Sequence, residues 1–193
     1  MLNMSNNRRH IILYIVLGVA IALPYVGFIG LHRWYTNKAE DIKNARFIIV
    51  DKSSMTLALY DYRGSELMNI SMACGQSHGD KQKMGDMRTP EGVFSVASIE
   101  DASSWKHDFG DGNGEIEGAY GPVFIRLNCG EYKGIGIHGT HLPASIGTRA
   151  SEGCIRINND DLLRLAEQVH PGMVVAVLPS AEDAEVNKII KTK

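Results

Sequence analysis

From Ala45 onward, the sequence is a succession of short runs rich in Val, Ile, Phe and Tyr, separated by turn residues. Runs of this length and composition are typical of β-strands. Seven strands are predicted, at Arg46–Asp51, Thr56–Tyr60, Leu67–Ala73, Gly92–Ser98, Val123–Leu127, Gly136–His138 and Met173–Leu178. The pattern therefore predicts a mainly β domain, either a sandwich or a barrel.

One packed helix is predicted beside these strands. Asn158 or Asn159 can cap its start, two aspartates follow in its first turn, and His170-Pro171-Gly172 ends it. Apolar residues recur at the helical spacing i, i+3, i+4, i+7: Leu162, Leu165, Ala166 and Val169. The folded domain is expected to span residues 45–179, and residues 180–193 are expected to form a polar tail that frays.

The first 44 residues have a different character. Residues 1–10 are polar and carry Arg8 and Arg9, and residues 11–31 contain no charge. As a helix, at about 1.5 Å per residue, the uncharged run is about 30 Å long, enough to cross the hydrocarbon core of a bilayer. The sequence therefore predicts a cytoplasmic N-terminus (1–10), a transmembrane signal anchor (11–31) and a linker (32–44).

A cleavable signal peptide is the alternative, with Ile11–Val19 as its apolar core and Ala20-Ile21-Ala22 as its cleavage site. The apolar run continues for nine residues past Ala22, which a cleaved peptide does not need, and this favours the anchor. An anchor holds the domain at the outer side of the cell membrane, periplasmic or extracellular. Cleavage makes the domain a secreted protein.

Export makes the three cysteines informative. An odd number in an oxidising compartment leaves at least one thiol unpaired. Cys74 and Cys129 either form a disulfide or remain buried free thiols, and the sequence leaves both open. Cys154 differs from these two because the residues around it suit a nucleophilic thiol.

The net charge of -2 gives no case for a basic face, so nucleic-acid binding is not expected.

Residues 135–161 contain the parts of an acyl-transfer site. A thiol is mostly protonated at neutral pH, so Cys154 needs an imidazole as its base, and His138 is the candidate. The imidazole needs an acceptor that fixes its tautomer, and the backbone carbonyl of Gly139 can serve. Gly153 lets the chain turn tightly enough for adjacent N–H groups to converge on an oxyanion.

Arg156 lies two residues after Cys154, so in an extended segment the two side chains share a face. A guanidinium there suits a substrate carboxylate and favours the thiolate. Ser151, at the start of the same turn, is a candidate for positioning the oxyanion loop or the substrate. The alternative for Ser151 is a turn former without a further role.

This segment resembles the signature of the YkuD-type L,D-transpeptidases, the cysteine transpeptidases of peptidoglycan. The resemblance rests on His138-Gly139-Thr140, Ser151-Glu152-Gly153-Cys154-Ile155-Arg156, Asn159 and Asp161. Two upstream stretches, residues 85–94 and Tyr120-Gly121-Pro122, are similar to segments of the same family. The similarity runs from about Phe47 to Leu178.

The resemblance implies an L,D-transpeptidase that acts on peptidoglycan tetrapeptide stems through a thioester on Cys154 and releases D-Ala. The product is a 3–3 crosslink when the acceptor amine belongs to a second stem, and an anchored lipoprotein when it belongs to a lipoprotein lysine. Water as acceptor makes the enzyme an L,D-carboxypeptidase. No cofactor or metal is required, and no obligate protein partner is expected beside the stem peptides and the membrane.

The sequence disfavours three other classes of protein. A sortase has its histidine and cysteine much farther apart, with its arginine on another strand. A papain-like endopeptidase would place the cysteine before the histidine. A catalytically silent wall-binding module would be expected to lack Cys154 or His138. One departure from the family pattern is Glu152, where many members have histidine, and a carboxylate there opposes thiolate formation.

Two long loops are predicted, a basic one over residues 75–91 and an acidic one over residues 100–121. A calcium loop beginning at Asp111 fails, because Ile116 stands where glycine is needed and Pro122 where a bidentate glutamate is needed. The acidic segment is instead predicted to be a flexible loop or lid. Three basic residues are expected to be exposed charges, with contact to an anionic wall polymer as the alternative: Lys81, Lys83 and Arg88.

His138 and His141 have a spacing that suggests metal binding. In an extended segment, however, they face opposite sides and no third ligand is evident, so no metal site is predicted. Thr140 and Arg149 are candidates for lining the cleft, with solvated loop positions as the alternative.

Overall fold

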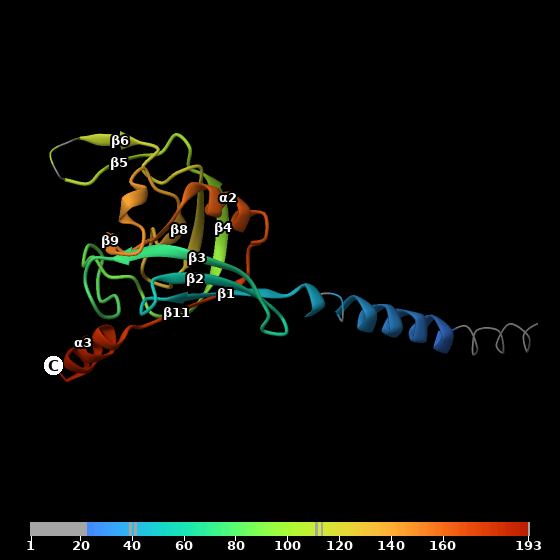
Figure 1. The fold of residues 1–193 in the computed structure, drawn as a ribbon. Helices are drawn as coiled ribbons and strands as arrows, with labels where there is room; N and C mark the ends of the chain where they lie inside the picture. The colour runs from blue at the N-terminus through green and yellow to red at the C-terminus, as the bar shows by residue number, and fades with distance from the viewer. Residues whose placement is uncertain (1–22, 39, 41, 111, 113, 193) are drawn as a thin grey trace, which may run out of the picture. The chain divides into compact units, whose positions relative to one another are not determined.

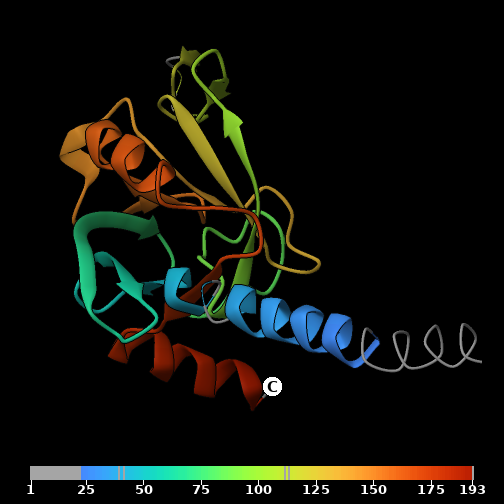
Figure 2. The ribbon, with the colours of Figure 1, turned by 90° about the vertical axis from the view of Figure 1, so that its right-hand side faces the viewer.

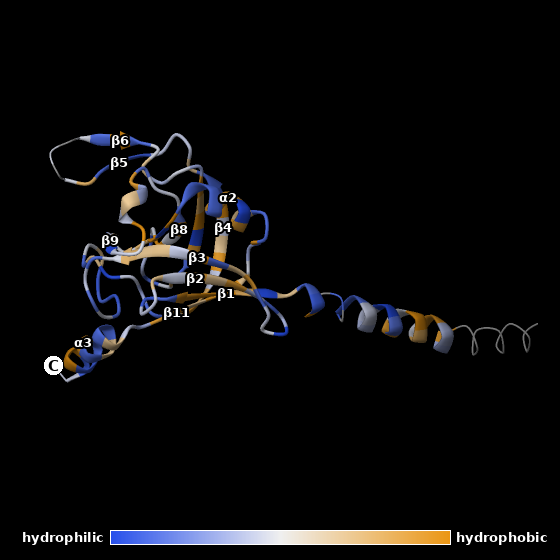
Figure 3. Cartoon of the chain, in the orientation of Figure 1, coloured by the Kyte–Doolittle hydropathy of each residue, from blue (hydrophilic) through white to orange (hydrophobic). Residues whose placement is uncertain are grey.

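The computed structural model describes residues 23–38, 40, 42–110, 112 and 114–192. The chain divides into two units, Met1–Asn44 and Ala45–Lys193. In the first unit, residues 23–38 are helical and their side chains are exposed. The hydropathy colours of Figure 3 show both apolar and hydrophilic residues along this helix. Residues 11–22 of the predicted anchor lie outside the described residues. Within the described ranges, no helix combines the length and the apolar character needed to cross a membrane.

The second unit is built on a sheet that closes on itself (Figure 1). In the described chain the strand order of this sheet is β10-β8-β7-β4-β11-β1-β2-β3-β9, and β10 also pairs with β3. The strands are β1 (Arg46–Asp51), β2 (Thr56–Asp61), β3 (Glu66–Gly75), β4 (Gly92–Asp101), β7 (Val123–Asn128), β8 (Gly136–His138), β9 (Arg149–Ser151), β10 (Ile155–Ile157) and β11 (Val174–Leu178). Because β10, at one end of the order, also bonds to β3 near the other end, the architecture is barrel-like.

All seven predicted strands are present, and β1 and β8 have the predicted bounds. The strands that the sequence did not predict are short: β9 and β10 in the barrel, and β5 (Lys106–Asp108) and β6 (Glu115–Glu117) outside it. A segment of three residues is too short for an alternating pattern to show. β9 and β10 are stabilised by pairing with β3 and β8, which are distant in sequence, whereas β5 and β6 pair with each other.

The core of the second unit is aliphatic. Ile48, Leu57, Ile125, Ile137 and Ile155 come from five strands and are fully buried in one cluster. Burying a side chain of this size stabilises the fold by about 1.5–3 kcal/mol, so the cluster is the main source of stability.

The predicted helix is present as α2 (Asn159–Ala166), and it buries Leu162 and Leu165. It ends at Ala166, earlier than the predicted stop at residues 170–172, although Val169 is still buried in the turn that follows. Asn158 is the N-cap residue but its side chain makes no capping hydrogen bond. The side chain of Asn159 instead accepts a hydrogen bond from the backbone N–H of Thr140, at 2.9 Å.

The expected fraying of the C-terminal tail is wrong, because residues 181–191 form a second helix, α3 (Ala181–Lys191). Ser180 and Asp183 form a capping box at its start. Asp183 is fully buried, and it also accepts hydrogen bonds from the backbone N–H of Gly79 and from Arg149. Interactions with the 75–91 segment therefore hold this helix in place.

The acidic segment and α3 lie at opposite ends of the second unit (Figures 1 and 2). Within the acidic segment, β5 and β6 pair as an antiparallel two-stranded sheet, with His107 opposite Ile116. The segment predicted as an irregular loop or lid is therefore a hairpin, shown in yellow-green at the top of both views.

Candidate active site

The register of two parallel strands brings the predicted residues together. β8 and β10 are neighbours, with Ile137 opposite Ile155 and His138 opposite Arg156. Side chains two residues apart on a strand share a face of the sheet. Cys154, just before β10, therefore falls on the face that carries His138 and Arg156.

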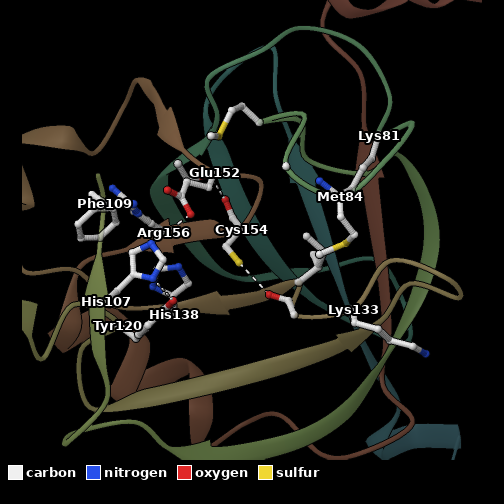
Figure 4. Close-up of a pocket in the computed structure, with 15 residues that line it drawn as sticks. Lys81, Met84, His107, Phe109, Tyr120, Lys133, His138, Glu152, Cys154 and Arg156 are labelled. Carbon is white, nitrogen blue, oxygen red and sulfur yellow. Dashed lines mark hydrogen bonds and ion pairs between the residues drawn. The ribbon is translucent and has the colours of Figure 1, made fainter. Parts of the chain in front are cut away.

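These three side chains line one pocket of about 240 Å³ (Figure 4). Ser151 and Glu152 also line it. The sequence-based expectation that the thiol and the imidazole meet at one cavity therefore agrees with the geometry.

His138 is held in one orientation by its surroundings. Its ring is buried and stacks on Phe124, with ring centroids 5.6 Å apart and planes 9° apart, and it packs edge-on against Tyr120. Nδ1 lies 2.6 Å from the carbonyl oxygen of Gly139, the contact expected from the sequence. In the neutral imidazole Nδ1 donates to this oxygen, so Nε2 is the free basic nitrogen. Burial lowers the pKa of His138 to about 3, so the ring is neutral at physiological pH.

Cys154 is partly exposed, and its thiol lies 3.3 Å from the carbonyl oxygen of Gly134, to which it donates. Burial raises the pKa of the Cys154 thiol, while a hydrogen bond from the backbone of Gly136 and the charge of Arg156 oppose that rise. The resting pair is therefore a neutral thiol and a neutral imidazole. Among the described residues no hydrogen bond joins the two, and the thiol must rotate toward His138 before it can transfer its proton.

The other two cysteines are unsuited to this chemistry. Cys74 and Cys129 are both free and buried, which answers the disulfide question that the sequence left open. Burial raises the pKa of Cys74, and it raises the pKa of Cys129 to about 12. Both behave as small apolar core residues.

Ser151 shapes the turn that carries the nucleophile. Its hydroxyl donates to the carbonyl oxygen of Cys154, at 2.5 Å, and accepts from the backbone N–H of Gly153, at 3.1 Å. Gly153 has a φ of 133°, and a Cβ at this position would lie 2.7 Å from the carbonyl oxygen of Arg88. Only glycine fits this turn without displacing the neighbouring backbone.

Arg156 places a buried cation in the pocket. It is 6% exposed, and its Nε has no hydrogen-bond partner among the residues that the structure describes. Its guanidinium lies over the ring of Phe109, 5.2 Å from the centroid. A buried guanidinium with a free donor suits a planar anion such as a carboxylate.

The hairpin contributes pocket residues that the sequence did not single out. Nε2 of His107 lies 3.1 Å from a carboxylate oxygen of Glu152, and Nδ1 of His107 lies 3.0 Å from the hydroxyl oxygen of Tyr120. Phe109 closes the pocket beside Arg156. Tyr120 stands in a segment similar to the family, whereas no local signal marks His107 or Phe109.

Several polar residues that the sequence placed in solvent or in the cleft lie elsewhere in the structure. Lys81, expected to be an exposed charge, is buried in the pocket wall with a relative exposure of 2%. Arg149 does not line this pocket. Its guanidinium bonds instead to Asp183, at 2.7 Å. Thr140 is also buried outside it. The ring of His141 packs on Phe109, 5.2 Å between centroids.

The described part of the chain contains no group of three or more His, Cys, Asp or Glu side chains that could hold a metal ion. The barrel-like β domain thus brings to one cavity a cysteine, a neutral histidine and a buried arginine, which are groups that cysteine enzymes use.

The chain belongs to the YkuD family, because the family's sequence model, that of an L,D-transpeptidase catalytic domain, matches residues 45–177. The protein YqjB of Bacillus subtilis is 32% identical over 133 residues, which cover 68% of this chain and 70% of that protein. The protein YkuD of Bacillus licheniformis is 44% identical over 62 residues, 32% of this chain. That match spans only 36% of the length of the relative.

Solved structures show the same fold. The catalytic domain from the L,D-transpeptidase of Enterococcus faecium superposes with a TM-score of 0.52 at 24% identity, covering 70% of this chain and 98% of that one. An L,D-transpeptidase from Mycobacterium smegmatis gives a TM-score of 0.52 at 19% identity, over 69% of this chain and 58% of that one. The resemblance noted in the sequence is therefore confirmed at the level of family and fold.

Proposed function

We propose that this protein is an L,D-transpeptidase that acts on the tetrapeptide stems of peptidoglycan. The observation that carries the proposal is the convergence of Cys154 and His138 on one pocket, behind a turn ordered by Ser151, in a chain of the YkuD family. The donor is the bond between the third, diamino-acid residue of the stem and its terminal D-Ala.

The first half-reaction forms the acyl-enzyme. Nε2 of His138 takes the proton of the Cys154 thiol as the sulfur bonds to the carbonyl carbon, and the carbonyl electrons move to the oxygen. Backbone N–H groups of the Gly153 turn stabilise that oxyanion. When the intermediate collapses, the C–N bond breaks and His138 returns the proton to the amine of the leaving D-Ala.

The second half-reaction consumes the thioester. An acceptor amine gives its proton to His138 and attacks the carbonyl carbon, and the sulfur leaves as the thiolate, which regains the proton. Arg156 binds a carboxylate of the stem and fixes the scissile bond relative to the sulfur. This scheme needs no metal or organic cofactor. Because the imidazole starts neutral, it can act as a base at every pH above its depressed pKa.

The proposal is tested by incubating the full chain in detergent with purified disaccharide-tetrapeptides and measuring the products by mass spectrometry. Release of D-Ala with formation of a 3–3 crosslinked dimer is expected. Tripeptide without dimer identifies an L,D-carboxypeptidase, and exchange of D-Ala for an added D-amino acid identifies an amine acceptor other than a stem. Absence of any product, with folded protein, contradicts the proposal.

Variants assign the roles. Cys154→Ala and His138→Ala are each expected to abolish release of D-Ala while the melting temperature shows that the protein is folded. A carbapenem is expected to add its mass to the wild type and not to Cys154→Ala. A wild type that forms no adduct favours the catalytically silent wall-binding module. Near-normal turnover by Cys154→Ser contradicts the nucleophile assignment.

We also propose that residues 11–31 anchor the domain at the outer face of the cell membrane. The uncharged sequence supports this, as do the exposed apolar side chains Leu23, Val26 and Phe28 at the start of the described helix. Extraction of cell membranes with alkaline carbonate is expected to leave the full chain in the membrane. A processed chain in the soluble fraction, starting after Ala22, indicates a cleaved signal peptide instead.

A further inference from the structure

Lys81 is a lysine that the fold buries beside the nucleophile. Its side chain is 1% exposed and lines the same pocket as Cys154. Nζ donates to a carboxylate oxygen of Asp86, at 2.9 Å, and to the carbonyl oxygen of Arg88, at 3.3 Å. An ammonium carries three N–H bonds. One of them is therefore left without an acceptor among the described side chains and backbone groups.

Asp86 holds the ammonium in place. Its two carboxylate oxygens also accept hydrogen bonds from three backbone N–H groups, those of Gln82, Lys83 and Arg88. Burial alone would raise the pKa of the Asp86 carboxyl, but these hydrogen bonds and that of Lys81 hold it at about 2. The partial positive charges of the three N–H groups offset part of the negative charge of Asp86, so Asp86 does not fully cancel the charge of Lys81. A net positive potential from Lys81 therefore remains on the pocket side.

The ammonium faces the turn that would carry the oxyanion. A Cβ at Gly153 would lie 3.4 Å from Nζ of Lys81, and 2.7 Å from the carbonyl oxygen of Arg88. The segment that carries Lys81 thus packs directly against the backbone of Gly153. Because Gly153 precedes Cys154, the charge stands within a few ångströms of the amides proposed for the oxyanion.

Two cations flank the thiol. Figure 4 shows Arg156 on one side of Cys154 and Lys81 on the other. The remaining charged or titratable side chains that line the pocket are Lys133, His107, Tyr120, Glu152 and His138. Among these, the carboxylate of Glu152 is engaged by His107, and His138 is neutral. The charges of Arg156 and Lys81 both act to lower the pKa of the Cys154 thiol against the effect of burial.

We propose that Lys81 is a second electrostatic group of the site, which stabilises the negative charge that forms on the sulfur of Cys154 and then on the attacked carbonyl oxygen. Lys81 acts through its charge alone, so no bond to it forms or breaks. Asp86 is its positioning residue. The role at the carbonyl oxygen rests on the proposed acyl transfer, whereas the role at the sulfur does not.

The role at the sulfur is tested on the full chain in detergent by the pH dependence of alkylation with iodoacetamide. Cys154→Ala gives the background, because Cys74 and Cys129 are buried. Lys81→Met is expected to raise the midpoint of the profile by about one pH unit and to slow alkylation about tenfold below that midpoint. The matched control is Lys83→Met, which removes an exposed lysine two residues away and is expected to leave the profile unchanged.

Two further variants separate charge from structure. Lys81→Arg keeps the positive charge and is expected to keep the midpoint within about 0.3 pH units of wild type. Asp86→Asn removes the counter-charge and is expected to lower the midpoint in a variant whose melting temperature shows that it is folded, because unfolding also lowers the midpoint by exposing the thiol. Melting temperatures show which variants are folded. If Lys81→Met is unfolded, the Asp86→Asn result decides.

Two results overturn the proposal. One is a folded Lys81→Met variant with the midpoint of Lys83→Met, and the other is an Asp86→Asn midpoint that equals or exceeds that of wild type. Turnover of tetrapeptide stems gives a separate readout, in which Lys81→Met is expected to lower kcat about tenfold or more with a smaller change in KM. If the wild type releases no D-Ala, the proposed function fails while the alkylation profile still decides the role of Lys81 at the thiol.

Discussion

Replacing Asp183 by asparagine tests whether a buried carboxylate joins the C-terminal helix to the rest of the domain. Asp183 has no exposed surface, and its carboxylate lies 2.7 Å from Arg149 and 3.3 Å from Lys52. The side chain of Lys52 is also fully buried. Asparagine keeps the size of the side chain and removes its charge, which leaves Lys52 with Glu91 as its remaining partner, at 2.6 Å.

Removing one member of a buried ion pair destabilises a protein by about 3–5 kcal/mol. The lower end applies here, because Glu91 still faces Lys52 and the asparagine carbonyl still accepts a hydrogen bond. A loss of about 3 kcal/mol lowers the melting temperature of a domain of this size by about 6–12 °C. The matched control is Glu185→Gln on the same helix, which breaks an exposed pair with Lys188 and is expected to cost about 0.5 kcal/mol or less.

The pH dependence supplies a second check. Burial would raise the pKa of Asp183, but hydrogen bonds from the backbone of Gly79 and Ser180 and the charge of Lys52 hold it below its ordinary range. A depressed pKa in the folded state contributes stability that is complete above the unfolded value of about 3.9 and is lost as the pH falls below it. Asp183→Asn should lack that part of the acid dependence.

The assay is thermal unfolding of the full chain in detergent, followed by near-ultraviolet circular dichroism between pH 3 and pH 8, a range chosen to bracket the unfolded pKa of about 3.9. Two outcomes would refute the reasoning. One is a melting temperature of Asp183→Asn within about 2 °C of Glu185→Gln at pH 7, which corresponds to less than about 1 kcal/mol. The other is a difference between the two variants that stays constant as the pH falls toward 3.

Three further predictions concern the pocket. Arg156→Lys keeps the charge but loses the planar fork, and kcat/KM for release of D-Ala should fall about 10- to 100-fold, the equivalent of about 1.5–3 kcal/mol. Ser151→Ala leaves the N–H of Gly153 and the carbonyl of Cys154 unpaired, so it should cost about 1–3 kcal/mol in thermal unfolding and also lower kcat. In wild type, alkylation of Cys154 should show a single midpoint above that of an ordinary thiol, about 8.5, and no step near 6.5, because the resting pair is neutral. A plateau of fast alkylation at neutral pH would show a preformed ion pair instead.

Local patterns in the sequence were enough to predict seven of the strands and to single out the cysteine and the histidine that line the pocket. β1 was predicted with its observed bounds because its run of apolar β-branched residues carries its own signal. The capping box of Ser180 and Asp183 is also a local pattern, since the two residues stand three positions apart. This pattern is visible in the sequence, but the expectation of a frayed tail took no account of it.

The sequence by itself determined which residues are chemically able to act, because thiol, imidazole and glycine turn lie within one short segment, and a spacing of this kind is visible along the chain. Only the tertiary structure decided that His138 and Arg156 stand side by side, since the register of β8 and β10 depends on strands that are not adjacent in sequence. It also decided that Lys81 is buried rather than solvated, because Asp86 and the packing against Gly153 hold it there. The burial of a charge depends on what the rest of the chain places around it, and no local pattern of residues records that environment.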